Sequence, residues 1–290
     1  MLTSDSLSAR VHVSNSTFSL IDMKKTISIL CALVALGSPV YAGTLMDQSV
    51  FGYTQFADGL SADVGTQKSS ITGTLGTGNE IWYGMLRTRG TSAAHFSGAT
   101  LSSQPYGSTR VAMSVSLMLD TSKLVRPTTG FSTIFSASNA AGLQWGLGIT
   151  STGSLCLLWQ ANSSGSITNH ATLGYTVPAT GSLSLSLVTG RYEGTAEGTR
   201  LYVGNSSTYF TNTALKFGGT SITQLNVGGD RTDNSRLQAA VQQLYVHDKA
   251  LSQTEVGSVM AEMAAVPEPA TATLSLLGLA CMAWRRRRAA

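Results

Sequence analysis

The side chains whose spacing best suits ion binding are Asp230, Asp233 and Asn234, which follow the pair Gly228-Gly229. Carboxylate and amide oxygens are the ligands that Ca²⁺ prefers in proteins. The same residue types are common in turns, where their oxygens accept hydrogen bonds from the local backbone. The sequence therefore predicts either a calcium site or a polar turn here, and it indicates no other cofactor.

Residue types that are used in catalysis are scattered along the chain. His95, His170 and His247 form no H-E-x-x-H pattern and the cysteines have no paired spacing, so a zinc site is not predicted. There is no G-x-S-x-G nucleophile motif. Glu193 and Glu197 indicate a solvated hairpin turn rather than the carboxylate pair, about 5 to 10 Å apart, of a glycoside hydrolase. We predict a domain without catalysis, and a glycan-active enzyme with dispersed carboxylates is the alternative.

Four aromatic residues could contact a ligand: Trp82, Tyr83, Tyr106 and Trp145. At exposed loops they would stack on sugar rings, whereas in a folded core they would only fill space. Exposure would favour extracellular glycans as partners. Burial would favour a structural role or contact with other surface proteins.

The elements that must position these residues are short strands. Apolar stretches are brief, and several alternate with a period of two, as in Val111–Leu119 and Leu183–Leu187. Alternation indicates sheets with one buried face, and many short strands without intervening amphipathic helices predict an all-β sandwich. The predicted strands are Ser49–Phe56, Glu80–Thr88, Arg110–Leu119, Phe131–Ser136, Leu143–Ile149, Leu155–Gln160, Ala171–Thr176, Leu183–Val188, Thr199–Val203, Gln224–Val227 and Leu237–Val246.

Two segments depart from this pattern. Gly90–Ser108 is rich in Ser and Gly and is predicted to be a long surface loop. Ser252 and Glu255 form S-x-x-E, in which each side chain can bond the other residue's backbone N–H. Because apolar residues follow at helical spacing, we predict one short helix over Ser252–Ala264.

The N-terminal part has the pattern of a secretory signal. Met23-Lys24-Lys25 is a basic start, and Thr26–Leu36 is an apolar run that is too short to span a bilayer. A signal peptide with a signal helix is therefore predicted over residues 23–42, cleaved by signal peptidase after Ala42. A buried helix of the fold is the alternative. Residues 1–22 are polar, and an over-extended gene start would explain them.

The C-terminal part, residues 266–290, has three sections, and each has a physical interpretation. Two prolines leave an extended stretch that a processing enzyme can grip, and the apolar run that follows can enter a membrane as a helix. Arginines are costly to move through lipid, so they hold the end of the chain on the cytoplasmic side. The sections are Val266, Pro267, Glu268 and Pro269, then Ala270–Trp284, then Arg285, Arg286, Arg287 and Arg288.

This arrangement resembles the PEP-CTERM sorting signal of Gram-negative bacteria over Val266–Arg288. The resemblance implies recognition by an exosortase-type transpeptidase and cleavage near Pro267-Glu268-Pro269. Release or attachment at the cell surface would follow. The apolar run is short for a permanent span, so a transient anchor in the inner membrane fits it best. An ordinary tail anchor is the alternative.

The composition of the body, residues 43–265, differs from that of the whole chain. The chain has 19 basic and 15 acidic residues, but seven of the basic and three of the acidic residues lie in the two ends. The body is therefore neutral and has no basic stripe, so nucleic acid is not a predicted partner. Cys156 is the body's one cysteine and lies among apolar residues. Stability must then come from a core rather than from a disulfide.

A second resemblance covers Gly198–Val256, which looks like the C-terminal part of a concanavalin A-like (LamG-like) jelly-roll domain. The residues that carry it are Leu201–Asn205, Leu225–Gly229 and Leu237–Val256, which ends in Ala-Leu and S-x-x-E. The resemblance implies a two-sheet jelly roll, carbohydrate as the ligand class, and calcium as a recurrent family feature. Gln242-Gln243 stands where the family often has an acidic pair, which weakens the case for an ion there.

Together these features predict an exported protein that reaches the cell surface or extracellular matrix of a Gram-negative bacterium through the inner membrane. Residues 43–265 are predicted to be one non-catalytic jelly-roll domain that binds carbohydrate or protein. Residues 266–290 are predicted to be a sorting and anchoring tail.

Overall fold

The computed structural model describes residues 44–56, 60–98, 100–103, 110–139, 141–160, 166–193, 196–215 and 221–266. The predicted signal helix, the predicted membrane helix, the sorting residues from Pro267 to Arg288, and Tyr106 lie outside these ranges. Within the described ranges, no helix has both the length and the apolar character needed to cross a membrane.

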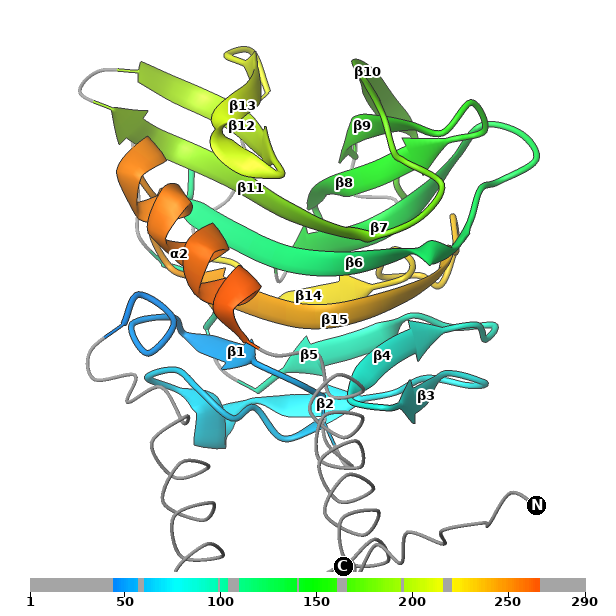
Figure 1. Cartoon of the computed structure of the whole chain (residues 1–290), viewed down its shortest axis with the longest axis horizontal. Helices are drawn as coiled ribbons and strands as arrows, with labels where there is room; N and C mark the ends of the chain where they lie inside the picture. Colours follow the sequence, from blue (N-terminus) through cyan, green and yellow to red (C-terminus); the bar gives the residue numbers. More distant parts are fainter. Residues whose placement is uncertain are drawn as a thin grey trace, which may run out of the picture. The chain divides into compact units, whose positions relative to one another are not determined.

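The described residues fold into two antiparallel sheets that form a sandwich, as predicted (Figure 1). The first sheet has the order β13 (Asn205–Asn212), β12 (Ala196–Val203), β11 (Ser182–Glu193), β6 (Met113–Val125), β15 (Gln238–His247), β4 (Met85–Thr88) and β3 (Glu80–Trp82), and β1 (Phe51–Tyr53) also pairs with β15. The second has the order β10 (Asn169–Thr176), β9 (Ser154–Trp159), β8 (Gln144–Thr150), β7 (Phe131–Ser138), β14 (Gln224–Val227), β5 (Ala94–Ser97) and β2 (Thr72–Thr74). A short 3-10 helix, η2 (Lys68–Ser70), precedes β2.

The core follows from the alternation of the strands. In β6, Val115, Leu117 and Leu119 are fully buried in the main hydrophobic cluster. The residues between them point to the opposite face, where Ser116 Oγ lies 2.8 Å from Ser186 Oγ of the neighbouring strand β11. Both faces of β6 are buried from Met113 to Leu119, where the helix α2 packs against the outer face of this sheet.

The helix α2 (Gln253–Ala265) begins at the predicted capping box. Ser252 Oγ accepts a hydrogen bond from Glu255 N, and Glu255 Oε2 accepts one from Ser252 N at 2.8 Å. An N-cap of this kind contributes about 0.5–2 kcal/mol. Figure 1 shows the helix lying across β11 and β6. Its buried face is formed by Val256, Val259, Met260 and Met263, which pack with Met118, Val188, Tyr202 and Tyr245.

Two predictions about individual elements are wrong. Glu80–Thr88 is not one strand but the hairpin β3–β4, whose turn residues Tyr83 and Gly84 have φ values of 49° and 76°. Positive φ at both positions is typical of the tight turns that join antiparallel strands. The predicted loop Gly90–Ser108 contains β5, which is paired with β14 on one side and β2 on the other.

Candidate functional site

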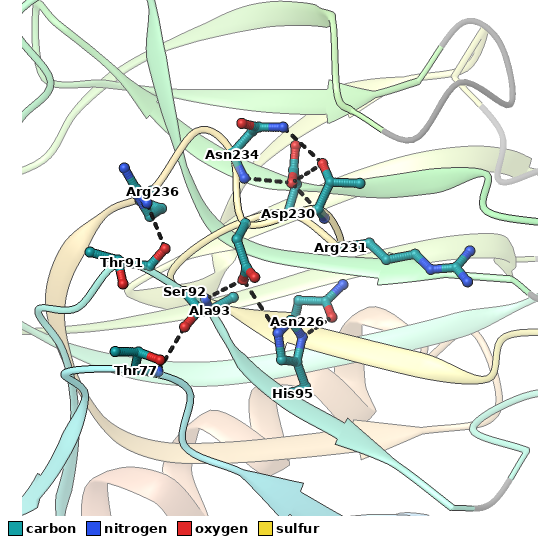
Figure 2. Close-up of polar contacts among 12 residues, drawn as sticks. Thr77, Thr91, Ser92, Ala93, His95, Asn226, Asp230, Arg231, Asn234 and Arg236 are labelled. Carbon is teal, nitrogen blue, oxygen red and sulfur yellow. Dashed lines mark hydrogen bonds and ion pairs between the residues drawn. The ribbon is translucent and has the colours of Figure 1, made fainter.

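The residues predicted to bind calcium lie in the loop that follows β14 (Figure 2). Asp230 is fully buried, and its Oδ1 accepts hydrogen bonds from Thr232 N at 2.9 Å, Thr232 Oγ1 at 2.8 Å and Asn234 N at 2.9 Å. Its Oδ2 accepts one from Ile167 N at 3.2 Å. The carboxylate therefore closes a polar turn and fastens it to the segment before β10.

Asp233 and Asn234 belong to the same turn but face different partners. Asp233 Oδ1 accepts a hydrogen bond from Ala93 N at 2.7 Å. Asn234 Nδ2 donates to Ser166 Oγ at 2.9 Å and to Thr232 Oγ1 at 3.0 Å. In the described part of the chain, no group of three or more His, Cys, Asp or Glu side chains could hold a metal ion. The calcium site stays a prediction, and the donors around Asp230 favour the polar turn.

A polar network starts at His95 of β5 and crosses the outer face of the second sheet. His95 Nε2 lies 3.3 Å from Asp233 Oδ1, and its Nδ1 lies 2.8 Å from Asn226 Oδ1 of β14 (Figure 2). Asn226 Nδ2 donates to Ser136 Oγ at 3.0 Å on β7, which in turn donates to Gln144 Oε1 at 3.2 Å on β8. Because Arg231 N also donates to Gln144 Oε1, at 2.7 Å, the network fixes the loop after β14 to the sheet.

Three other residues considered for chemistry, Cys156, Glu197 and His247, have the following surroundings. Burial raises the pKa of the Cys156 thiol to about 12, so this cysteine is protonated and inert at neutral pH. Glu197 lies in the predicted hairpin, but in the strand β12 opposite Arg191 rather than in the turn, and its Oε1 is 3.4 Å from Arg110 Nη1. His247 is buried at the end of β15, where its Nε2 bonds to the carbonyl oxygen of Leu45.

The described aromatic residues differ in exposure, from the buried Trp145 through the half-buried Trp82 to the exposed Tyr83. Trp145 is 1% exposed in the main core, so it cannot stack on a ligand, and the core alternative holds for it. Tyr83 is 70% exposed at the tip of the β3–β4 hairpin. The ring of Trp82 packs edge-on against it, with centroids 4.6 Å apart and an interplanar angle of 69°.

Two cationic side chains lie over the ring of Trp82. The guanidinium carbon of Arg87 lies 4.5 Å from the centroid of Trp82, and Lys123 Nζ of β6 lies 5.8 Å from it. Glu80 Oε1 accepts ion pairs from Arg87 Nη1 at 3.1 Å and Arg89 Nη1 at 3.2 Å. We call the residues Trp82, Tyr83, Arg87, Arg89 and Lys123 the Trp82 surface.

The sequence identified the two aromatic residues of this surface as candidates for ligand contact, but it did not identify the three cationic residues. Arg87 and Trp82 come together because β3 and β4 form a hairpin, in which Glu80 lies opposite Arg87. Lys123 reaches the same ring from β6, on the far side of β15 in the sheet order. The hairpin was detectable from Tyr83-Gly84, but the position of Lys123 depends on long-range strand pairing.

Comparison with solved structures places the fold among known β-sandwich proteins. A sialidase of Trypanosoma rangeli in complex with the inhibitor DANA aligns with a TM-score of 0.54 and 13% identity, over 84% of this chain and 39% of its own. The same sialidase without a named ligand aligns with a TM-score of 0.54 and 12% identity, over 85% and 40%. The chain therefore spans about two fifths of the sialidase, and at this identity the likeness concerns the fold alone.

A crystal structure of the botulinum neurotoxin serotype D binding domain aligns with a TM-score of 0.49 and 13% identity, over 74% of this chain and 51% of its own. No curated protein matches the sequence. One family model matches the C-terminal end, and it covers only that segment. Residues 265–288 carry a PEP-CTERM protein-sorting motif, which implies an exported protein that is processed by exosortase.

Proposed function

We propose that this chain is a surface or extracellular-matrix protein of a Gram-negative bacterium whose body, residues 43–265, is a non-catalytic glycan-binding domain. The PEP-CTERM motif at residues 265–288 supports the export and sorting part of this proposal. The observation that carries the binding part is the exposed ring of Tyr83, which the half-buried ring of Trp82 supports edge-on.

Three properties suit this pair for contact with a sugar ring. Tyr83 is 70% exposed, so a ligand can reach its ring without any rearrangement of the core. Trp82 supports it from the side, and Arg87 covers the indole, so the rings have little freedom to lose on binding. Tyrosine and tryptophan combine a large apolar face with a polar tip, which matches the mixed surface of a sugar.

A glycan array with the full-length chain in mild detergent tests this function. We expect binding to at least one glycan, and a loss of about tenfold in affinity for Tyr83→Ala. Tyr209→Ala is the matched control, because Tyr209 is 43% exposed on the opposite edge of the same sheet, in β13. Equal binding by both variants would exclude glycan recognition by Tyr83. Absence of binding throughout would contradict the proposed function and favour a structural or protein-binding role.

The enzyme alternative is tested on the same samples. A glycan-active enzyme would release reducing sugar from the glycans that the array identifies, whereas a binding domain leaves them intact. Release of reducing sugar by the parent chain would contradict the non-catalytic proposal.

A further inference from the structure

The charges around Trp82 narrow the ligand class of the proposed function. We infer that the Trp82 surface binds an anionic polysaccharide, with one sugar ring against Tyr83 and the carboxylate or sulfate of the sugar at Arg89 and Lys123. This inference rests on the proposed function and adds to it the chemical class of the ligand.

The first argument is the local balance of charge. Arg87, Arg89 and Lys123 supply positive charges, and Glu80 is the one carboxylate paired with them among the described residues. Asp120, also on β6, forms no ion pair with these cations among the described residues, and its Oδ1 accepts hydrogen bonds from Ser122 N and Ser122 Oγ. The body as a whole is neutral, so an excess of positive charge beside the exposed ring of Tyr83 and the half-buried ring of Trp82 distinguishes this surface from the rest of the body.

The second argument is that the three cations differ in exposure and in the contacts they make. The side chain of Arg87 is only 19% exposed, and it is held between Glu80 and the face of Trp82. That of Arg89 is 54% exposed, and Lys123 is exposed on β6. Arg87 therefore orients the indole, whereas Arg89 and Lys123 can still reach an anion in solution. Arginine and lysine donate several hydrogen bonds to carboxylate or sulfate oxygens.

The third argument is the contrast with the opposite edge of the sheet. There the guanidinium carbon of Arg200 lies 4.3 Å from the centroid of Tyr209, so the same residue types again form a cation–aromatic contact. Arg200, however, is only 7% exposed, and its Nη1 donates to Tyr202 Oη at 3.1 Å. A buried guanidinium of this kind stabilises the sheet but cannot contact the anionic groups of a polysaccharide. The two edges thus provide a test surface and a matched control in one chain.

The experiment measures binding of the full-length chain, in mild detergent, to three polysaccharides: polygalacturonate, dextran sulfate and uncharged dextran. We expect binding to at least one of the two charged polymers and not to dextran. Affinity should fall at least tenfold between about 50 and 500 mM salt, because exposed charge pairs are screened. The stronger of the two charged polymers identifies the preferred anion, carboxylate or sulfate.

Two variants test whether the Trp82 surface makes this contact. Arg89→Gln combined with Lys123→Gln should weaken binding at least tenfold and abolish its salt dependence. Tyr83→Ala should weaken binding while leaving the salt dependence in place. Tyr209→Ala should bind like the parent chain, and thermal unfolding of each variant verifies that the sandwich is intact.

Three outcomes would overturn the inference in different ways. If the double variant binds normally while Tyr83→Ala does not, the ligand is a neutral glycan and only the proposed function stands. The same conclusion follows if dextran binds as well as the charged polymers. If the folded protein binds no glycan, both the proposed function and this inference are wrong. Binding to detergent micelles that contain phosphatidylglycerol is measured in parallel. If the variants alter only that binding, the surface contacts a membrane and not a polysaccharide.

Discussion

His247 donates its Nε2–H to the carbonyl oxygen of Leu45, 2.9 Å away, and thereby links the end of β15 to the first described residues of the chain. Glu262 of α2 holds the same segment, since its two carboxylate oxygens accept hydrogen bonds from Leu45 N at 3.4 Å and Met46 N at 3.2 Å. The segment that follows the predicted signal peptide is thus fastened to the helix that precedes the sorting motif.

This contact predicts that acid weakens the folded state. Burial lowers the pKa of His247 below its ordinary value of 6.5, and its Nδ1 has no hydrogen-bond partner among the described residues. Below about pH 6.5 the unfolded chain therefore binds a proton that the folded chain resists. The free energy of unfolding should fall as pH drops from 6.5 toward the lowered pKa, by at most about 1.4 kcal/mol per pH unit.

Denaturant unfolding at pH 7.5, 6.0 and 5.0 checks this prediction. His247→Gln keeps an N–H donor for Leu45 and should flatten the slope in this range. His170→Gln, which removes an exposed histidine of β10, should leave the slope unchanged. The lowered pKa of Glu255 also weakens the fold in acid, but only below about pH 4.5. A parent chain whose stability is constant from pH 7.5 to 5.0 would contradict the role given to His247.

Removal of the Glu262 carboxylate should loosen the first segment without unfolding the sandwich. For Glu262→Ala we expect a loss of about 1–2 kcal/mol, because two partly buried backbone N–H groups lose a charged acceptor. Hydrogen exchange should accelerate at Leu45 and Met46, while the amides of β6 stay protected. Glu262→Gln retains a single acceptor and should show a smaller effect. Unchanged exchange at Leu45 in the alanine variant would show that other contacts hold the segment.

Calcium should not stabilise this protein. Asp230 Oδ1 already accepts three hydrogen bonds, and an ion would have to displace these donors. Isothermal calorimetry at millimolar calcium should therefore show no binding heat, and thermal unfolding no shift. Asp230→Ala should lower stability by about 1–3 kcal/mol, since it leaves buried N–H groups without an acceptor. A calcium-dependent shift that disappears in Asp230→Asn would instead establish the site.

The sequence predicted elements well where alternation was strong. Val111–Leu119 alternates clearly because one face of β6 fills the core, and the capping box at Ser252 marks the start of α2. The strand β13 was not predicted. It is rich in Ser and Thr and largely exposed, so no alternation of apolar residues marks it in the sequence. β5 was missed for a related reason, because a four-residue strand with a single large apolar side chain depends on its partners.

The Trp82 surface could likewise be predicted only in part from the sequence. Trp82 and Tyr83 are visible as adjacent aromatic residues, but their exposure depends on the turn between β3 and β4. Lys123 comes to Trp82 through the order of strands in the first sheet, which a single sequence does not reveal. Local patterns thus predict elements, whereas a surface built from β3, β4 and β6 requires the fold.

The turn at the tip of the Trp82 surface gives the last prediction. Gly84 has a φ of 76°, a conformation that costs an alanine about 1–2 kcal/mol. Gly84→Ala should therefore lower stability by this amount and displace the neighbouring Tyr83. Gly204, with a φ of 72° and open space around it, provides the same strain in the β12–β13 turn. Gly204→Ala should cost equal stability and leave glycan affinity intact, whereas Gly84→Ala should weaken it about tenfold. Equal affinity in both variants would mean that the position of Tyr83 does not govern binding.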